Sequence, residues 1–240
     1  MRRRVAGFIT LFSSLLVVLA TYGISQAQTQ TIANLQYLSA LEREIINEVN
    51  LARANPTQYA TYLEQLKKLY VGKDLKRPGQ VALTTVEGVS AVDEAIQFLR
   101  AQKPLPPLTP YQGMCLAARD HLTDLGKTGS TGHKGSDGSV PEDRLNRYGS
   151  WTNVVGENIA YSSITARETV MGWIVDDGNP TRGHRKNLFN AQYLATGIAL
   201  GGKSAYGTMC INTFAGGFAD KPASAQSSKD KTKPAAKMFE

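Results

Sequence analysis

The order of the secondary-structure signals along the chain restricts the fold more than any other feature. The first half of the 240 residues carries helix patterns, whereas the second half carries three strand-like runs, at 152–162, 193–201 and 206–217. A helix pattern opened by the capping box Thr165-Ala166-Arg167-Glu168 separates the first two runs. Helices followed by strand, helix, strand and strand predict an α+β fold in which helices cover a small sheet.

Apolar residues recur at helical spacing in the first half of the chain. Ser39-Ala40-Leu41-Glu42 is typical of a capping box that starts a first helix, and Asn55-Pro56 ends that helix and opens a second. A third helix is expected at about 86–102, and Thr109-Pro110 is expected to open a fourth. Ser139-Val140-Pro141-Glu142 predicts the start of a further short helix.

The first 27 residues have the pattern of a secretory signal peptide. Three arginines precede an apolar run at 5–20, and Ser25-Gln26-Ala27 supplies small residues where a signal peptidase cleaves. The alternative is a membrane anchor, but the run is about four residues short of the roughly 20 that span a bilayer. We therefore expect a protein that is secreted, extracellular or periplasmic, with no stable transmembrane span in its mature form.

The formal net charge of +7 is concentrated at the two ends of the chain. Residues 221–240 carry five lysines against two acidic residues, and the signal segment carries three arginines, so the part between them is nearly neutral. A nearly neutral domain has no electrostatic footprint for a polyanion, so no nucleic-acid partner is expected. The segment 221–240, rich in Lys, Ala and Ser, predicts a disordered tail.

The three histidines of the chain are its candidates for metal binding or proton transfer. His133 lies in a glycine-rich loop, and Gly183-His184-Arg185 follows the motif Gly156-Glu157-Asn158. Imidazoles and carboxylates brought together from separate segments are what a divalent-cation site needs. Local roles stay open for His133 and His184, as a surface residue and a helix-start residue, and for Glu157, as a carboxylate that bonds a neighbouring loop. His121, within a helix pattern, is expected to be structural.

Cys115 and Cys210 are the only cysteines. Export would let a disulfide between them persist, and the closed loop of about 95 residues would be worth up to about 4–5 kcal/mol in the chain-entropy model. The alternative is a pair of buried thiols that never meet.

Taken together, these motifs resemble the CAP superfamily, which comprises cysteine-rich secretory proteins, antigen 5 and pathogenesis-related 1 proteins and whose domain is also called the SCP domain. The resemblance covers about residues 41–217 and implies a three-layer α-β-α sandwich with a small, mostly antiparallel sheet, in a domain at 37–219. The matching residues are His133, Gly156-Glu157-Asn158, Trp173, Gly183-His184-Arg185 and Asn187-Leu188-Phe189-Asn190, with Asn50-Leu51-Ala52-Arg53 and Asn212-Thr213-Phe214-Ala215 near the two ends.

The resemblance also implies a cleft lined by two histidines and two acids, which in several members hold a divalent metal. Carried over by position, this tetrad is His133, Glu157, Asp176 and His184, with both histidines as metal ligands and Asn158 in support. Asp176 stands where eukaryotic members usually have glutamate, and the neighbouring Asp177 leaves the assignment of the second acid open. Two imidazoles leave coordination positions for water, so an open, zinc-like site is expected.

The chain departs from the compact family pattern through a helical insertion around 63–106, and it has no cysteine-rich hinge domain. It also lacks a His-Glu-x-x-His helix, a Gly-x-Ser-x-Gly elbow and a phosphate-binding loop. The favoured hypothesis is a secreted binding protein, not an enzyme, whose cleft holds a divalent cation and a lipid or cell-envelope ligand. The alternative is a metal-assisted hydrolase, protease-like or esterase-like, with Glu157 as general base.

Overall fold

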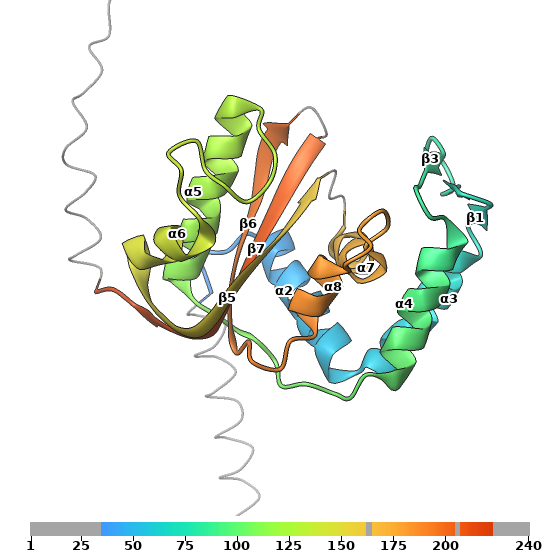
Figure 1. Ribbon diagram of the computed structural model, residues 1–240, viewed down its shortest axis with the longest axis horizontal. Coiled ribbons are helices and arrows are strands. Elements are labelled where there is room, and N and C mark those ends of the chain that lie inside the picture. Colours follow the sequence, from blue (N-terminus) through green and yellow to red (C-terminus); the bar gives the residue numbers. More distant parts are fainter. Residues whose placement is uncertain (1–34, 162–164, 205–206, 223–240) are drawn as a thin grey trace, which may run out of the picture. The chain divides into compact units, whose positions relative to one another are not determined.

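The computed structural model describes residues 35–161, 165–204 and 207–222 (Figure 1). The predicted signal peptide at 1–27 and the tail at 223–240 lie outside the described residues. Residues from Ala40 onward form one compact unit, while the turn at 35–39 belongs to another. The disordered tail was predicted to start at Lys221, but Lys221 is still bonded to the folded domain. The backbone N–H of Lys221 donates to the carbonyl of Tyr148 (2.8 Å), and its ammonium group donates to the carbonyl of Asn146 (2.6 Å).

The helices of the described residues follow the apolar periodicity of the sequence. Pro56 occupies the first turn of its helix, as predicted, because a first-turn residue needs no N–H donor. The helix expected from about 86 begins later, after Gly88, whose φ of 72° is left-handed. The helices are α2 (Ala40–Ala54), α3 (Pro56–Lys67), α4 (Val89–Ala101), α5 (Gln112–Thr128), α6 (Pro141–Tyr148), α7 (Ala166–Val175) and α8 (Gly183–Leu188).

Two of the predicted helix starts can be compared with the observed caps. At α7 the hydroxyl oxygen of Thr165 accepts from the backbone N–H of Glu168 (3.2 Å), which confirms that cap. At α6 the predicted box is shifted by one residue, since the N–H of Val140 donates to the carboxylate of Asp143 (3.1 Å). Pro141 occupies the first helical turn of α6, so the residue directly before it becomes the cap.

The central sheet has the strand order β4-β6-β7-β5. Its long strands β5 (Gly149–Tyr161), β6 (Ala195–Ser204) and β7 (Gly207–Asp220) pair antiparallel and coincide with the three predicted runs to within a few residues. The short strand β4 (Thr109–Pro110) adds one parallel pairing to β6. The predicted small, mostly antiparallel sheet is therefore confirmed.

Thr109-Pro110 was expected to open a helix, and that prediction is wrong. The N–H of Thr109 donates to the carbonyl of Leu194 (2.9 Å), and the N–H of Tyr111 donates to that of Thr196 (3.0 Å). Pro110 has no N–H, which a strand tolerates at the edge of a sheet. Helix α5 starts only afterwards, at Gln112.

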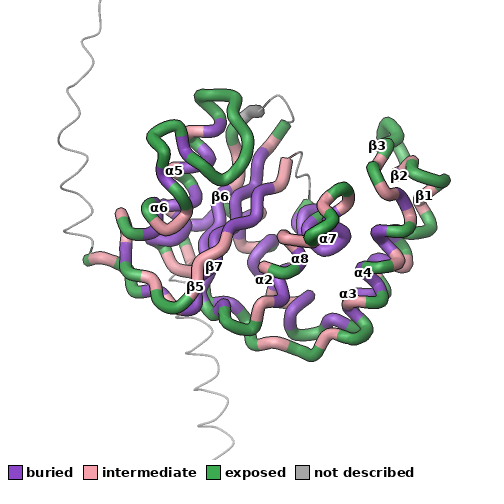
Figure 2. Tube along the Cα trace, viewed as in Figure 1, coloured by how far each residue is buried: buried purple, intermediate pink, exposed green. Residues whose placement is uncertain are grey.

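Helices cover both faces of the sheet (Figure 1). Helices α5 and α6 pack on one face, and α2, α7 and α8 lie against the other. Buried residues line the strands and the helix faces turned toward them (Figure 2). One core cluster joins α5 to β5, β6 and β7 through Ala118, Leu122, Leu125, Ile159, Ala199, Met209 and Ile211. This layering is the expected α-β-α sandwich.

The insertion between α2 and α5 is not wholly helical, contrary to the prediction. Helices α3 and α4 pack against each other, and between them a small antiparallel sheet is formed by β1 (Tyr70–Val71), β2 (Asp74–Leu75) and β3 (Leu83–Thr84). Strands of two residues are too short to show the alternation that marks a strand in a sequence. The sequence therefore carries no readable signal for them.

Arg53, at the end of α2, fastens that helix to two connecting segments. Its side chain is fully buried, and its guanidinium group donates to the carbonyls of Pro106 (3.1 Å), Leu188 (2.7 Å), Asn190 (3.2 Å) and Tyr193 (3.1 Å). The first carbonyl belongs to the link before β4, the second to the last residue of α8, and the other two to the link between α8 and β6. One side chain thus fixes the approach of both links to the sheet.

Both cysteines are free and buried. Cys115 lies on α5, where its sulfur accepts from the N–H of Ile198 (3.3 Å), and Cys210 lies within β7. Burial raises the pKa of the Cys115 thiol to about 12 and also raises the pKa of Cys210. Of the two alternatives, the structure has the separate buried thiols.

Gly197 on β6 tests the closeness of α5 to the sheet. A Cβ atom there would lie 2.3 Å from the carbonyl carbon of Met114 and 2.6 Å from the backbone nitrogen of Cys115. We expect Gly197→Ala to lower the free energy of unfolding by about 1–3 kcal/mol or more, measured by urea denaturation. Gly172→Ala is the control, since a Cβ on Gly172 of α7 meets nothing within 4 Å. The control should be neutral or stabilising; equal losses would contradict the packing argument.

Candidate functional site

Glu157, on β5, forms a buried ion pair with Arg144 of α6. Nη2 of Arg144 lies 3.1 and 2.9 Å from the two carboxylate oxygens, and both side chains are at most 2% exposed. The same guanidinium group donates to the carbonyls of Ser139 (3.0 Å) and His133 (3.1 Å). The pair therefore neutralises the carboxylate and fixes the loop that carries His133.

His133 lies in the loop between α5 and α6 and reaches the same carboxylate. Its Nδ1 is 2.9 Å from Oε1 of Glu157, while half of its side chain is exposed. A carboxylate only accepts hydrogen bonds, so the Nδ1 proton points at Glu157 and Nε2 carries the free lone pair. Among the described residues, no hydrogen bond reaches that Nε2.

His184 and Asp176 form a second histidine–carboxylate pair. Asp176 caps the end of α7 in a left-handed conformation with φ 53°. Its carboxylate accepts from Nδ1 (2.7 Å) and from the backbone N–H (2.9 Å) of His184. Burial acts to raise the pKa of Asp176, but the hydrogen bonds from His184 outweigh it and hold that pKa below its usual range. As in His133, the ring Nε2 of His184 has no hydrogen bond to any residue that the structure describes.

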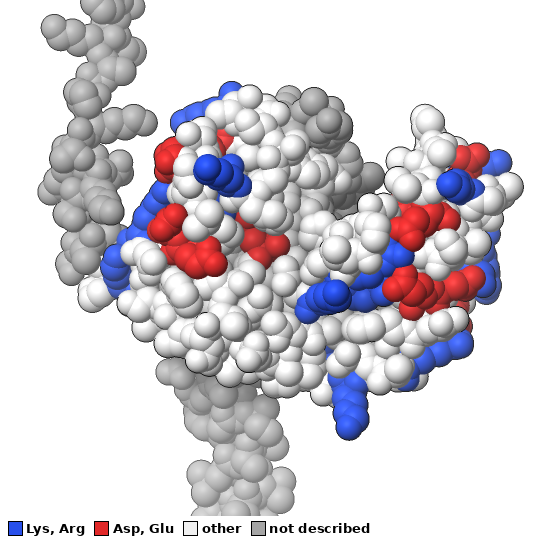
Figure 3. Space-filling model, in the orientation of Figure 1, with Lys and Arg blue, Asp and Glu red and all other residues white. Residues whose placement is uncertain are grey.

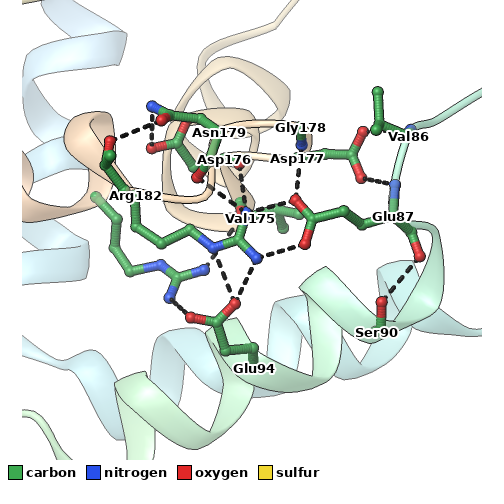
Figure 4. Close-up of polar contacts among 12 residues, drawn as sticks. Val86, Glu87, Ser90, Glu94, Val175, Asp176, Asp177, Gly178, Asn179 and Arg182 are labelled. Carbon is green, nitrogen blue, oxygen red and sulfur yellow. Dashed lines mark hydrogen bonds and ion pairs between the residues drawn. The ribbon is translucent and has the colours of Figure 1, made fainter.

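Asp177 is not the partner of His184. Its carboxylate accepts from the backbone N–H groups of Val86 (2.6 Å) and Glu87 (2.8 Å), just before α4 (Figure 4). Asp176 and Asp177 thus point to different elements, and the ambiguity between them resolves in favour of Asp176 as the acid that holds the histidine.

Asn158 connects the two histidine–carboxylate pairs. Its amide donates to the carbonyl of His184 (3.0 Å), and its oxygen accepts from Asn187 (2.9 Å), whose amide also reaches the carbonyl of Glu157 (3.3 Å). Gly156 is required beside them, because a Cβ there would lie 2.3 Å from the hydroxyl oxygen of Tyr193. This explains the Gly-Glu-Asn motif as a junction between β5 and α8.

His121 is structural in its contacts, as expected from its helix. It is buried on α5, and its Nε2 lies 2.9 Å from the carbonyl oxygen of Gly132 and 3.8 Å from Oε1 of Glu157. Burial lowers the pKa of His121, so the ring is neutral at pH 7. Its contact with Gly132 links α5 to the loop that carries His133.

A cleft of about 480 Å³ lies beside the second pair. Its walls come from the end of β5, from α7, from the Asp176–His184 loop and from the insertion, and they include Ile159, Tyr161, Trp173, Asp176, Val81 and His184. Two further hollows, of about 260 and 620 Å³, continue along α7 beneath the insertion. Glu157 and His133 are not among the lining residues, so of the predicted tetrad only Asp176 and His184 line this cleft.

The described residues do not form a complete metal site on their own. Within residues 35–161, 165–204 and 207–222, no group of three or more His, Cys, Asp or Glu side chains is arranged to hold a metal ion. In His133 and in His184, the ring Nδ1 faces a carboxylate and Nε2 has no hydrogen-bond partner among the described residues. This is the orientation that a histidine needs to bind a metal ion.

Arg182 joins the site to the insertion, which sequence reasoning missed. It donates to both carboxylate oxygens of Glu87 (2.6 Å each) and to Glu94 of α4 (2.8 and 2.6 Å), and also to the carbonyl of Asp176 (2.9 Å) (Figure 4). The hydrogen bond from Arg182 lowers the pKa of Glu87 to about 2. Some 90 residues separate these groups in sequence, and no local signal links them.

Arg185 of α8 binds Glu94 as well, and we call the contacts of Arg182 and Arg185 with the insertion the Arg182 clamp. Arg185 donates to Glu94 (3.0 Å) and, from a buried position, to the carbonyls of Ile174 and Val175 at the end of α7. Figure 3 shows acidic and basic groups side by side over this part of the molecule, not a patch of one sign.

Removing Arg144 tests whether its buried ion pair with Glu157 stabilises the fold. Arg144→Met leaves Glu157 as an uncompensated buried charge, so the free energy of unfolding should fall by about 3–5 kcal/mol. The matched control is Lys67→Met, which breaks an exposed pair with Asp93 (2.6 Å, side chains 45% and 42% exposed) and should cost less than about 1 kcal/mol. Chemical denaturation measures both. Similar losses would mean that the buried pair does not hold this region.

Comparison with solved structures gives two bacterial relatives at low similarity. An outer surface protein from Borrelia burgdorferi is 20% identical, with a TM-score of 0.39, and the match covers 46% of this chain and 78% of that one. An extracellular protein containing a SCP domain from Bacillus anthracis is 23% identical, with a TM-score of 0.37, and the match covers 53% of this chain but only 38% of the other. No curated protein matches. Residues 94–214, half of the chain, match the CAP family, described as the cysteine-rich secretory protein family, and the chain therefore belongs to that family.

Proposed function

We propose that this CAP-family chain is a secreted binding protein whose cleft, beside Asp176 and His184, holds a lipid or other amphipathic cell-envelope ligand together with a divalent cation. The pattern of the first 27 residues supports export. In the part of the chain that the structure describes, every helix is too short or too polar to cross a membrane.

The observation that carries this proposal is the continuity of the cleft with the hollows along α7. Arg77 and Glu168, an ion pair with 3.0 Å between nitrogen and oxygen, line the cleft and both hollows. One end carries the polar pair Asp176–His184, and the hollows are lined by Leu66, Leu69, Leu75, Met171 and Val175. A polar head group with an aliphatic chain complements such a surface, since apolar walls with few polar groups are typical of ligand sites.

A cation would be held by the two histidines. Their Nε2 atoms would be its protein ligands, with His184 reaching it from the cleft wall and His133 from the loop between α5 and α6, and with water or the ligand itself in the remaining positions. A bound cation would supply positive charge to an anionic head group. Glu157 and Asp176 would act from behind the rings by fixing their tautomers.

The binding role is better supported than hydrolysis with Glu157 as general base. A general base must reach the proton that it removes, directly or through one water. The Glu157 carboxylate is 1% exposed and is occupied by Arg144 and His133. Its surroundings favour holding a loop in place over accepting a proton from a substrate.

Filling the cleft tests ligand binding. Gly172 lines the cleft and the adjoining hollow, and a Cβ there meets nothing within 4 Å, so Gly172→Phe should block the apolar path without disturbing α7. We expect the affinity for a fluorescent fatty acid to fall by more than about tenfold in an equilibrium titration. Gly126→Phe, an exposed position on α5, is the control and should bind as the unmodified chain does. Unchanged binding in Gly172→Phe would exclude this cleft.

Zinc titration calorimetry tests the cation. His184→Ala and His133→Ala should each remove most of the binding heat, because each deletes one of two protein ligands. Asp176→Asn should weaken binding less, by about 10–100-fold, since it acts through the ring. Asp93→Asn is the control and should retain binding, because this exposed carboxylate on α4 pairs with Lys67 and lines neither the cleft nor the hollows. Equal losses in Asp93→Asn and His184→Ala would mean that the metal binds without a defined site.

A further inference from the structure

The insertion exposes apolar side chains to water in one short segment. We call residues 70–86 the insertion hairpin. Of the six exposed large apolar residues in the described parts of the chain, four lie on it: Val71 (61% exposed), Val81 (94%), Leu83 (54%) and Val86 (64%). Figure 1 places β1 and β3 at the end of the α3–α4 pair, and Figure 2 shows this end as mostly exposed. Such a concentration of apolar surface marks a contact site.

The same segment is cationic. Lys73 and Lys76 are exposed, and in the described residues no side-chain hydrogen bond or ion pair engages either ammonium group. Lys68 lies just before the hairpin and is exposed as well. The single acidic residue between 68 and 86 is Asp74, whose carboxylate already accepts from the hydroxyl group of Thr84 (2.7 Å). The hairpin therefore offers free positive charge beside free apolar surface.

These two properties together identify the partner. The apolar side chains gain free energy only where water is removed from them, and the lysines gain only beside anions. The interface of an anionic bilayer supplies both, with hydrocarbon for the valines and lipid phosphates for the lysines. A second copy of the chain would bring the same positive charge to the contact and would be repelled. We propose that the insertion hairpin docks this protein on an anionic lipid bilayer.

The docking surface is distinct from most of the cleft, but docking would bring the cleft close to the membrane. Val71, Lys73 and Lys76 line neither the cleft nor the two adjoining hollows, whereas Val81 and Leu83 lie at the cleft wall. A docked hairpin would therefore bring the apolar side of the cleft to the membrane surface. Lys73 and Lys76 can therefore be changed without altering the residues that line the cleft.

Vesicle co-sedimentation of the full chain tests the proposal. The unmodified chain should bind vesicles of equimolar phosphatidylcholine and phosphatidylglycerol more tightly than pure phosphatidylcholine. Lys73→Glu/Lys76→Glu should reduce the partition coefficient at least about thirtyfold, because each charge near an anionic surface contributes about fivefold. Val71→Ser/Val81→Ser should also reduce it. The matched control is Lys103→Glu/Lys127→Glu, with the same charge change at exposed lysines outside the hairpin.

Several results would overturn the proposal. The first is that the hairpin and control variants lose binding equally, which would assign the attraction to net charge or to the N-terminal apolar run that all variants share. The second is a concentration-dependent dimer in sedimentation equilibrium that Val71→Ser/Val81→Ser abolishes, which would make a second copy the occupant. Fatty-acid binding by Lys73→Glu/Lys76→Glu should remain unchanged, so failure of docking and failure of the cleft proposal are distinguishable.

Discussion

Buried guanidinium groups hold this fold around its site. Arg53, Arg144 and Arg185 are each at most 3% exposed. Arg53 and Arg144 donate to backbone carbonyls of connecting segments, and Arg185 donates to the carbonyls at the end of α7. Burial lowers the pKa of Arg53 to about 10 and also lowers that of Arg185, yet both remain charged at neutral pH. An unpaired buried charge costs several kcal/mol, so the connecting segments must stay where their carbonyls satisfy these donors. The two free cysteines contribute no covalent link, and this placement depends on hydrogen bonds.

The two histidine–carboxylate pairs differ in their electrostatic surroundings. Glu157 faces Arg144 as well as His133, so its charge is balanced inside the protein. Within the part of the chain that the structure describes, no guanidinium group bonds the Asp176 carboxylate, which accepts hydrogen bonds from His184 and Asn179. The first pair therefore holds the His133 loop in place. The second pair, which lines the cleft, retains the negative charge that a cation or a polar head group can meet.

The three long strands were predictable because they follow from local pattern, and the sandwich because it follows from the motif order that carries the family resemblance. The tetrad was expected to line one cleft, whereas His133 and Glu157 are not among the residues that line it. The Thr165 cap and the Pro56 helix start follow from backbone chemistry that operates within one turn. Thr109-Pro110 failed because its parallel partner lies far along the chain, and a two-residue strand has no periodicity of its own. The sequence placed Asp176 in the tetrad but left Asp177 open as the alternative, because adjacent carboxylates look alike in sequence. The contacts of Asp177 with the segment before α4 leave Asp176 as the acid that bonds His184.

The Arg182 clamp couples the insertion energetically to His184 in the cleft. Arg182 adopts a left-handed backbone with φ 52°, and its guanidinium group is shared between two carboxylates of the insertion and the carbonyl of Asp176. A displacement of α4 from α7 therefore changes the energy of the segment that orients His184. Coupling of this kind is reciprocal: whatever binds the insertion and shifts the affinity at His184 must have its own affinity shifted by the same factor when the cleft is filled. A ligand that binds the insertion and moves α4 would therefore act as an effector of the cleft.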